Sequence, residues 1–168
     1  MMELDRLSPA EFVALLGGIF EHSPWVAEAV VGWRPFGDLD RLHQVMVAAV
    51  MTAARARQLA LLEAHPELAG KLARSGGLTA ASAGEQASLG LDRLDEDEIA
   101  RFDQANALYR TRFGFPFIIA VKAQRDRRTI LEALESRVAN DRETEIATAL
   151  AEVAKIARFR LDALETAS

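Results

Sequence analysis

The sequence contains no cysteine, and only three histidines and five prolines among its 168 residues. The absence of cysteine excludes disulfides, thiolate metal sites and cysteine nucleophiles. Charged residues interrupt the apolar ones before any run reaches the roughly 18 residues of a membrane span, and the N-terminus lacks the pattern of a signal peptide. The 20 Lys and Arg against 25 Asp and Glu offer no broad surface for phosphate backbones. We therefore expect a cytoplasmic protein that binds neither nucleic acid nor membranes.

Apolar residues recur at helical spacing along most of the chain, and helix start signals precede several of these stretches. The length suits one domain with its own core. The pattern predicts a single all-α domain over residues 1–168, a bundle of seven to nine helices, of which the first extends from Pro9 to Phe20. The predicted caps are Ser8 with Glu11, Ser23, Asp38, Ser82 with Glu85, Asp95 with Glu98, and Asn140 or Asp141.

Two stretches lack helical spacing. Residues 70–78 contain Ser75-Gly76-Gly77 and are expected to form a mobile loop. The second stretch surrounds Gly114 and Pro116, and the apolar run Phe117–Val121 follows it. This run has the composition of a buried strand, but the sequence offers no second strand to pair with it. It is either buried extended chain or the start of a helix.

Three histidines give a short list of acid–base candidates. His22 and His43 lie within helical patterns, where packed or solvated histidines are common. His65 differs because it precedes Pro66 at a predicted helix end, where irregular backbone presents the side chain beside the loop. A structural role for a helix-terminal His-Pro pair remains an alternative.

Glu85 and Arg160 also have two interpretations each. Glu85 has the spacing of a capping-box acid after Ser82, and a carboxylate near a helix N-terminus can also orient an imidazole. On the last predicted helix, Arg160 falls about 40° from the direction of the apolar stripe at 100° per residue. An inward guanidinium needs a partner, because an unpaired buried charge is costly. That partner is either a glutamate of a neighbouring helix or an anionic ligand.

The same positions lie in segments that resemble one enzyme family, and the match covers almost the whole chain. The segments are His65-Pro66-Glu67-Leu68-Ala69-Gly70-Lys71, Glu85-Gln86-Ala87-Ser88, Phe113-Gly114-Phe115-Pro116-Phe117-Ile118-Ile119, and Asn140-Asp141-Arg142-Glu143-Thr144-Glu145, with Tyr109 and Arg160-Leu161. They resemble the 2-oxo-4-hydroxy-4-carboxy-5-ureidoimidazoline (OHCU) decarboxylases of urate breakdown. The resemblance implies an all-helical, homodimeric enzyme without metal or cofactor that forms (S)-allantoin.

The resemblance also implies roles for individual residues. It places the catalytic groups at His65, Glu85 and Arg160. Further residues are implied to contact or shape the substrate site, namely Pro66, Ser82, Gln86, Phe117, Ile118 and Ile119. The segment Ala123–Arg128 departs from the glycine-containing turn of many relatives, but it contains none of these residues.

The expected chemistry is loss of carbon dioxide, with His65 as general acid or base and Arg160 bound to an anionic or carbonyl group. The ring of the substrate can delocalise the charge left behind, so the reaction needs no external electron sink. One alternative is a decarboxylase or hydrolase of another ureido or imidazoline acid on the same scaffold. Another is a helical interaction module without catalysis.

Overall fold

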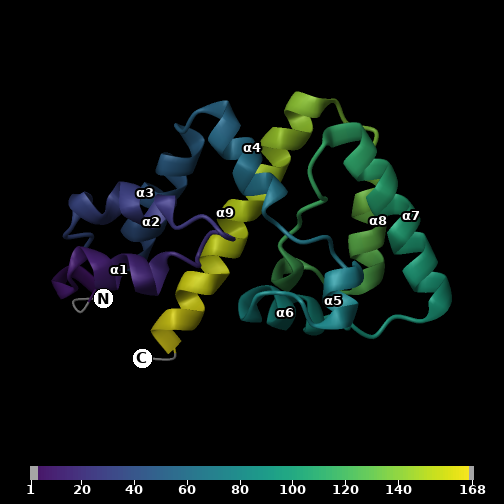
Figure 1. Cartoon of the computed structure of the whole chain (residues 1–168), viewed down its shortest axis with the longest axis horizontal. Coiled ribbons are helices and arrows are strands. Elements are labelled where there is room, and N and C mark those ends of the chain that lie inside the picture. Colours follow the sequence, from purple (N-terminus) through teal and green to yellow (C-terminus); the bar gives the residue numbers. More distant parts are fainter. Residues whose placement is uncertain (1–3, 167–168) are drawn as a thin grey trace. The chain divides into compact units, whose positions relative to one another are not determined.

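The computed structural model of the chain describes residues 4–166 (Figure 1). Nine α-helices and three 3₁₀ helices, with no strand, occur in this range, so the predicted all-α fold is confirmed. The α-helices are α1 (Pro9–Leu16), α2 (Trp25–Val30), α3 (Leu39–Met51), α4 (Arg55–Glu63), α5 (Lys71–Ser75), α6 (Ala80–Ala87), α7 (Glu96–Phe113), α8 (Arg127–Arg137) and α9 (Arg142–Thr166). The 3₁₀ helices are η1 (Leu4–Arg6), η2 (Val31–Trp33) and η3 (Val121–Ala123).

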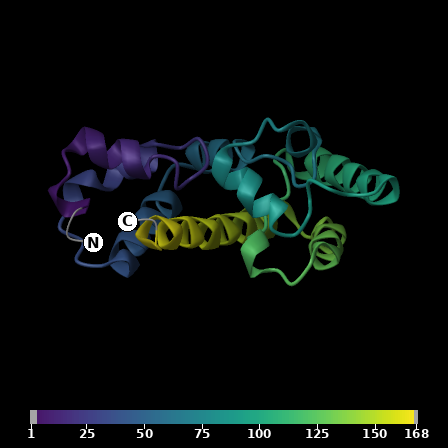
Figure 2. The same ribbon diagram turned by 90° about the horizontal axis from the view of Figure 1, so that it is seen from below.

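The chain divides into two compact units. The first unit contains Met1–Ala64 and Ala157–Ser168, and the second contains His65–Ile156. Helix α9, an unbroken helix in Figure 2, supplies residues to both units. A single domain over residues 1–168 stays a prediction.

In the first unit, α1 begins with the predicted capping box. The Ser8 hydroxyl accepts from the Glu11 N–H at 3.3 Å, and the Glu11 carboxylate accepts from the Ser8 N–H at 2.8 Å. Hydrogen bonds from the hydroxyl and the N–H of Ser8 hold the pKa of Glu11 below its ordinary value. The helix ends at Leu16 rather than at Phe20, because two glycines follow and glycine disfavours helix.

Two further expectations for the first unit are wrong. Ser23 does not cap α2, because its hydroxyl donates to the Glu21 carbonyl at 2.9 Å and the helix start has no side-chain cap. His22 lies not in a helix but in the preceding turn, at a positive φ of 46°. Both residues belong to the irregular stretch that replaces the end of the expected first helix.

Helices α3 and α4 of the first unit are separated by a sharp break. Asp38 caps α3 by accepting from the Arg41 N–H at 2.7 Å, as predicted. Helix α3 ends at Met51, and Gln58 of α4 donates to the carbonyls of Val50 and Met51 at 3.0 and 3.1 Å. These bonds satisfy carbonyls that a helix end leaves open. The two helices meet at 111°.

The helices of residues 4–166 differ from membrane spans in their length and composition. No single helix among them is long and apolar enough to cross a membrane. The bent pair of α3 and α4 meets the length and composition criterion when its two helices are taken together.

In the second unit, the start of α6 corrects a prediction. Thr79 is the cap, since its hydroxyl accepts from the Ser82 N–H at 3.3 Å, and the helix begins at Ala80. Threonine caps well and the following alanines favour helix, so the helix starts before Ser82. The predicted capping box of Ser82 and Glu85 is therefore wrong, and Glu85 lies inside α6.

The longer helices of the second unit follow the sequence signals closely. Asp95 and Glu98 form the predicted capping box of α7, which ends at Gly114 with a φ of 81°. Asp141 caps α9 by accepting from the Thr144 N–H at 2.9 Å. Helices α7 and α8 pack side by side (Figure 1). In residues 70–78, which were expected to form a loop, the structure forms the short helix α5.

Residues 116–120 cross the second unit as buried chain without helix or strand, which confirms the first of the two interpretations of this run. Helix η3 starts only at Val121. Around this chain, Tyr109 packs against the rings of Phe113, Phe115 and Phe117, with ring centroids 4.6 to 6.0 Å apart. Burial of each ring contributes about 2 kcal/mol, so these aromatic residues form much of the core of the second unit.

Candidate functional site

His65 opens a short buried loop in the second unit. Helix α4 ends at Glu63, and Pro66 prevents its continuation. The His65 side chain is only 7% exposed, and Pro66 is half-buried beside it. Four residues later, Ala69 is fully buried at a positive φ of 54°, an unusual conformation for alanine. A backbone in this conformation is kept there by its surroundings.

Gln86 of α6 binds this loop at two points. Its side-chain oxygen accepts from the Ala69 N–H at 2.9 Å, and its side-chain nitrogen donates to the Glu67 carbonyl at 3.3 Å. The sequence resemblance placed Gln86 at the substrate site. In the structure both ends of the Gln86 amide hold the backbone that follows His65.

Two residues outside α6 complete the attachment of the loop. Asn106 of α7 donates to the Leu68 carbonyl at 2.9 Å. Arg74 of α5 donates to the Ala69 carbonyl at 2.7 Å and pairs with Asp103 at 3.1 Å. Neither residue was predicted from the sequence. A polar residue in a helical pattern does not indicate which distant backbone group its side chain will bind.

Helix α6 contains three of the predicted site residues. Ser82 and Gln86, four residues apart, are 4% and 2% exposed on the buried face of the helix. Glu85 is partly exposed at the edge of that face. Helix α6 also packs against η3, the turn that directly follows Phe117–Ala120. The second unit thus groups every predicted site residue except Arg160.

Phe117, Ile118 and Ile119 are all buried, and a polar cluster holds their chain in place. We call Tyr109, Arg137, Asn140 and Glu145 the Arg137 cluster. Arg137 donates to the Ile118 carbonyl at 2.8 Å and to Glu145 at 2.7 Å, while the Tyr109 hydroxyl donates to the same Glu145 oxygen at 2.5 Å. Burial, followed by the hydrogen bond to Glu145, raises the pKa of Tyr109 above its ordinary value.

Arg160 lies in the first unit, where it is 7% exposed, so its predicted inward position is confirmed. Its guanidinium nitrogen Nη1 lies 2.8 Å from a carboxylate oxygen of Glu21, which is 2% exposed, and 3.3 Å from the Gly18 carbonyl. The structure therefore contains the internal ion pair that was one of the two alternatives. Its glutamate lies in the turn after α1 rather than in a helix.

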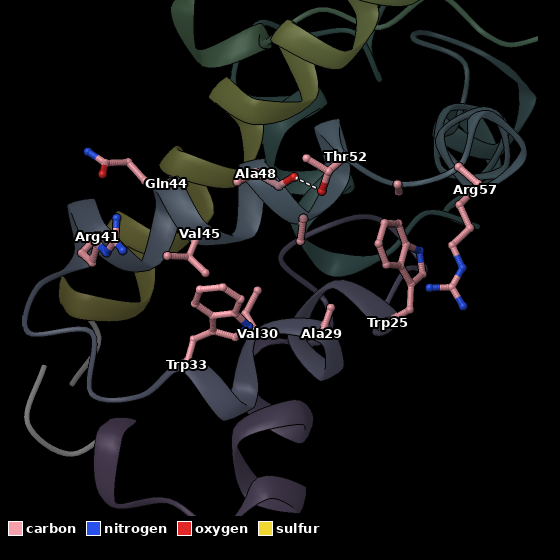
Figure 3. Close-up of a pocket in the computed structure, with 13 residues that line it drawn as sticks. Trp25, Ala29, Val30, Trp33, Arg41, Gln44, Val45, Ala48, Thr52 and Arg57 are labelled. Carbon is pink, nitrogen blue, oxygen red and sulfur yellow. Dashed lines mark hydrogen bonds between the residues drawn. The ribbon is translucent and has the colours of Figure 1, made fainter.

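A cavity of about 870 Å³ opens elsewhere in the first unit, and none of the predicted site residues lines it. Figure 3 shows Trp33 and Val30 on one side of this cavity facing Val45 of α3 on the other. Arg57 stacks on Trp25 at 5.1 Å. The lining contains no carboxylate and no histidine. The cavity therefore offers no general base for the expected reaction.

The described residues contain no group of three or more His, Cys, Asp or Glu placed to hold a metal ion. Two of the predicted acid–base residues, His65 of the loop and Glu85 of α6, belong to the second unit. An imidazole and a carboxylate with buried polar neighbours can bind a small polar molecule and transfer a proton.

Comparison with known proteins identifies the family. A sequence profile described as OHCU decarboxylase matches residues 5–162. This chain belongs to the OHCU decarboxylase family. An OHCU decarboxylase of Haloferax volcanii is 44% identical over 96% of this chain and 93% of its own length, and the mouse (Mus musculus) enzyme is 41% identical over 96% and 90%. A crystal structure of (S)-allantoin synthase superposes with a TM-score of 0.77 at 34% identity, over 96% of this chain and 52% of that one.

Membership of the OHCU decarboxylase family confirms the resemblance seen in the sequence. The main feature that the sequence did not predict is that the residues of the Arg137 cluster contact one another. On α9, Glu145 is about 100° from Ile146, at the margin of the apolar stripe. Arg137 is in the last turn of α8, where a basic residue is common. The available signal was that Tyr109, Asn140 and Glu145 belong to the residues and segments that resemble the family.

Proposed function

We propose that this protein decarboxylates OHCU to (S)-allantoin in urate breakdown. The observation that carries the proposal is the family match over residues 5–162, together with near-full-length similarity to relatives named for this activity. His65 and Glu85 support the proposal as a buried histidine and a partly exposed carboxylate, which are residue types that general acid–base catalysis uses. The substrate would be a small anionic molecule, and no metal or cofactor would take part.

In the proposed reaction, the bond between C4 and the carboxylate carbon breaks and carbon dioxide leaves. The electron pair moves into the ring and a ring nitrogen takes up a proton from solvent, then the C4 hydroxyl gives up its proton to become a carbonyl and a proton adds to the carbon that bears the ureido group, so that one proton is consumed overall. We assign the hydroxyl proton to His65, with Glu85 as the carboxylate that orients its imidazole. Addition of the new proton from one face sets the (S) configuration.

The remaining predicted residues have binding roles in this proposal. Arg160 pairs with an anionic or carbonyl group of the substrate. The backbone of Phe117–Ile119 contacts the ring or the ureido group, while Pro66 and Ser82 shape the site. Gln86 acts through the loop, since its amide binds the Glu67 carbonyl and the Ala69 N–H. Arg160 also pairs with Glu21, so its orientation depends on that carboxylate.

Freshly generated OHCU, followed by circular dichroism, tests the activity. OHCU decays spontaneously to racemic allantoin, so the expected result is accelerated formation of the (S) enantiomer. Rates on OHCU and on allantoate would separate this activity from that of an enzyme for another ureido acid. An interaction module without catalysis would accelerate neither reaction, and that result would overturn the proposal.

Substitution tests the proposed roles separately from the family assignment. His65→Ala is expected to lower kcat by about 100-fold or more, because general acid–base catalysis contributes on that order. Glu85→Gln is expected to lower kcat, because a neutral amide orients the His65 imidazole less well than a carboxylate does. Glu132→Gln, at an exposed position on α8, is the matched control. A folded His65→Ala variant with full activity would contradict the mechanism and leave the family assignment intact.

We also propose that the protein is a homodimer, as the family resemblance implies, and that it is cytoplasmic, as expected from its composition. Trp33 supports a contact between copies, because this large apolar side chain is 68% exposed. Light scattering after gel filtration measures the mass in solution. A mass of one chain at micromolar concentration would contradict the homodimer.

A further inference from the structure

The chain of Phe117–Ala120 is buried yet belongs to no helix or strand, so its backbone groups need partners from outside regular structure. Two charged side chains provide them. Arg137 of α8 donates from Nη1 to the Ile118 carbonyl at 2.8 Å. Glu152 of α9 accepts from the Ala120 N–H at 2.8 Å. This stretch of backbone is therefore placed by side chains.

Arg137 contacts the chain a second time through an aromatic ring. The carbon at the centre of its guanidinium lies 4.4 Å from the centroid of the Phe117 ring. The same planar group thus binds the Ile118 carbonyl and covers the preceding side chain. A guanidinium fixed at both points restricts the translation and the rotation of the chain at Phe117 and Ile118.

The guanidinium is itself held by a buried carboxylate. Glu145 of α9 is 0% exposed, and one of its oxygens lies 2.7 Å from Nε and 2.5 Å from Nη2 of Arg137. That oxygen also accepts from the Tyr109 hydroxyl at 2.5 Å, and the other accepts from Asn140 at 3.0 Å. Helices α7, α8 and α9 therefore all contribute to the orientation of one arginine.

Stability alone does not explain this arrangement. Burial of an ion pair costs desolvation energy that its attraction only partly returns, so apolar side chains of similar volume stabilise such a position equally well or better. What apolar side chains do not provide is a hydrogen bond to the Ile118 carbonyl. The Arg137 cluster provides fixed geometry at this carbonyl, beside the residues assigned to substrate contact.

We propose that Arg137, oriented by Glu145 and Tyr109, is a positioning residue that sets the Phe117–Ile119 backbone for binding of the substrate. This inference rests on the proposed function, in which that backbone contacts the ring or ureido group. Arg137 acts through the chain and does not touch the substrate. Its loss weakens substrate binding more than the chemical step, because His65 lies on a separate loop held by Gln86 and Asn106.

Arg137→Lys is the decisive variant. A lysine keeps the charge opposite Glu145, but a single ammonium group lacks the planar fork that joins the carboxylate, the Ile118 carbonyl and the Phe117 ring. We expect the melting temperature to stay close to that of the wild type. We expect KM for fresh OHCU to rise about 10-fold or more, within the range that a small misplacement produces, while kcat changes by less than about 3-fold.

Arg101→Lys is the matched control. Arg101 of α7 pairs with Glu135 of α8 at 2.9 Å, and the Arg101 side chain is 60% exposed. The control also replaces arginine with lysine in an ion pair of the second unit, away from the Phe117–Ile119 backbone. It should leave KM and kcat unchanged. A merely structural role for Arg137 predicts that its lysine variant also keeps the wild-type KM, and that result would overturn the proposal.

Amide hydrogen exchange tests the same inference without activity. In Arg137→Lys, the amides of Ile118–Ala120 should exchange faster, while the amides of α6 and of the His65 loop should keep their wild-type protection. Unchanged exchange at Ile118–Ala120 would overturn the positioning role even if KM rose. A wild-type protein inactive on OHCU would instead overturn the proposed function, and exchange would still decide whether Arg137 orders this chain.

Discussion

Among the described residues, a buried arginine–glutamate pair lies in each unit, and the two pairs differ in their surroundings. In the first unit, Arg160 and Glu21 lie 2.8 Å apart, with the Gly18 carbonyl as a further partner of the arginine. In the second unit, Glu145 binds Arg137, Tyr109 and Asn140 together. The first pair joins α9 to a turn, and the second joins three helices to a length of irregular chain.

Burial of an ion pair does not by itself indicate whether its role is structural or functional. Arg160 interrupts an apolar stripe, so its inward position was visible in the sequence. Arg137 is 12% exposed at a helix end, and its importance depends on the chain that it holds. The two pairs should therefore differ in their effects on stability, on activity and on the pH dependence of stability.

The largest expected effect comes from removal of each carboxylate. Glu145→Ala should lower the free energy of unfolding by about 4 kcal/mol, because it leaves a guanidinium and a phenol without their acceptor. Glu21→Ala should lower it by about 3 kcal/mol. Urea unfolding measures both values, with Glu135→Ala as an exposed control that should cost less than about 1 kcal/mol. A larger loss of unfolding free energy for Glu21→Ala than for Glu145→Ala would contradict the expected order of the two pairs.

Replacement of a whole pair separates stability from function. The double variant Glu21→Leu with Arg160→Met removes both charges of this buried pair, so its unfolding free energy should return to within about 1 kcal/mol of the wild type. The double variant should lack decarboxylase activity, because Arg160 is proposed to bind the substrate. A stable double variant with normal kcat and KM would show that Arg160 has only a structural role.

The Arg137 cluster also predicts an unusual titration. Tyr109 is the only tyrosine, so the ultraviolet absorbance of tyrosinate reports this residue alone. Burial and Glu145 raise the pKa of Tyr109 from its ordinary 10.0, so the folded protein should show no tyrosinate at pH values where the unfolded chain ionises. Because the unfolded state then binds fewer protons, stability should fall as the pH rises above about 10.

Tyr109→Phe provides the control for this titration. It should reduce the loss of stability above pH 10 and, at neutral pH, cost about 2 kcal/mol for the hydrogen bond to a charged group. The first unit contains no tyrosine, so neither its ion pair nor any variant of that pair should change the absorbance. A native protein that forms tyrosinate near pH 10 would contradict the buried hydrogen bond.

The smallest effect is expected at the margin of the Arg137 cluster. Asn140 donates to the second oxygen of Glu145 and is half-buried, so Asn140→Ala should cost about 1 kcal/mol by urea unfolding. Asn140→Asp should cost more, because it places a second carboxylate beside Glu145. Equal effects for the two variants would indicate that Asn140 contributes little to the orientation of Glu145.

Local signals predicted the helices well where a cap and a periodic pattern agreed. Asp38, Asp95 and Asp141 each cap the helix that was expected to follow. Prediction failed where two good caps lay close together, as at Thr79 and Ser82, or where glycines followed an apolar stretch, as after Leu16. In these places the alternative helix boundaries differ little in local free energy. The free energy of tertiary packing is larger than this difference and therefore sets the boundary.

The sequence by itself determined the all-α class, most helix starts, the inward position of Arg160 and the family. Local capping and periodicity act within a few residues, so one sequence is enough to read them. Only the tertiary structure decided that Gln86 and Asn106 hold the His65 loop and that Arg137 and Glu145 hold the Ile118 carbonyl. These bonds join residues from 8 to 38 positions apart, and no local pattern specifies which distant backbone group a polar side chain will satisfy.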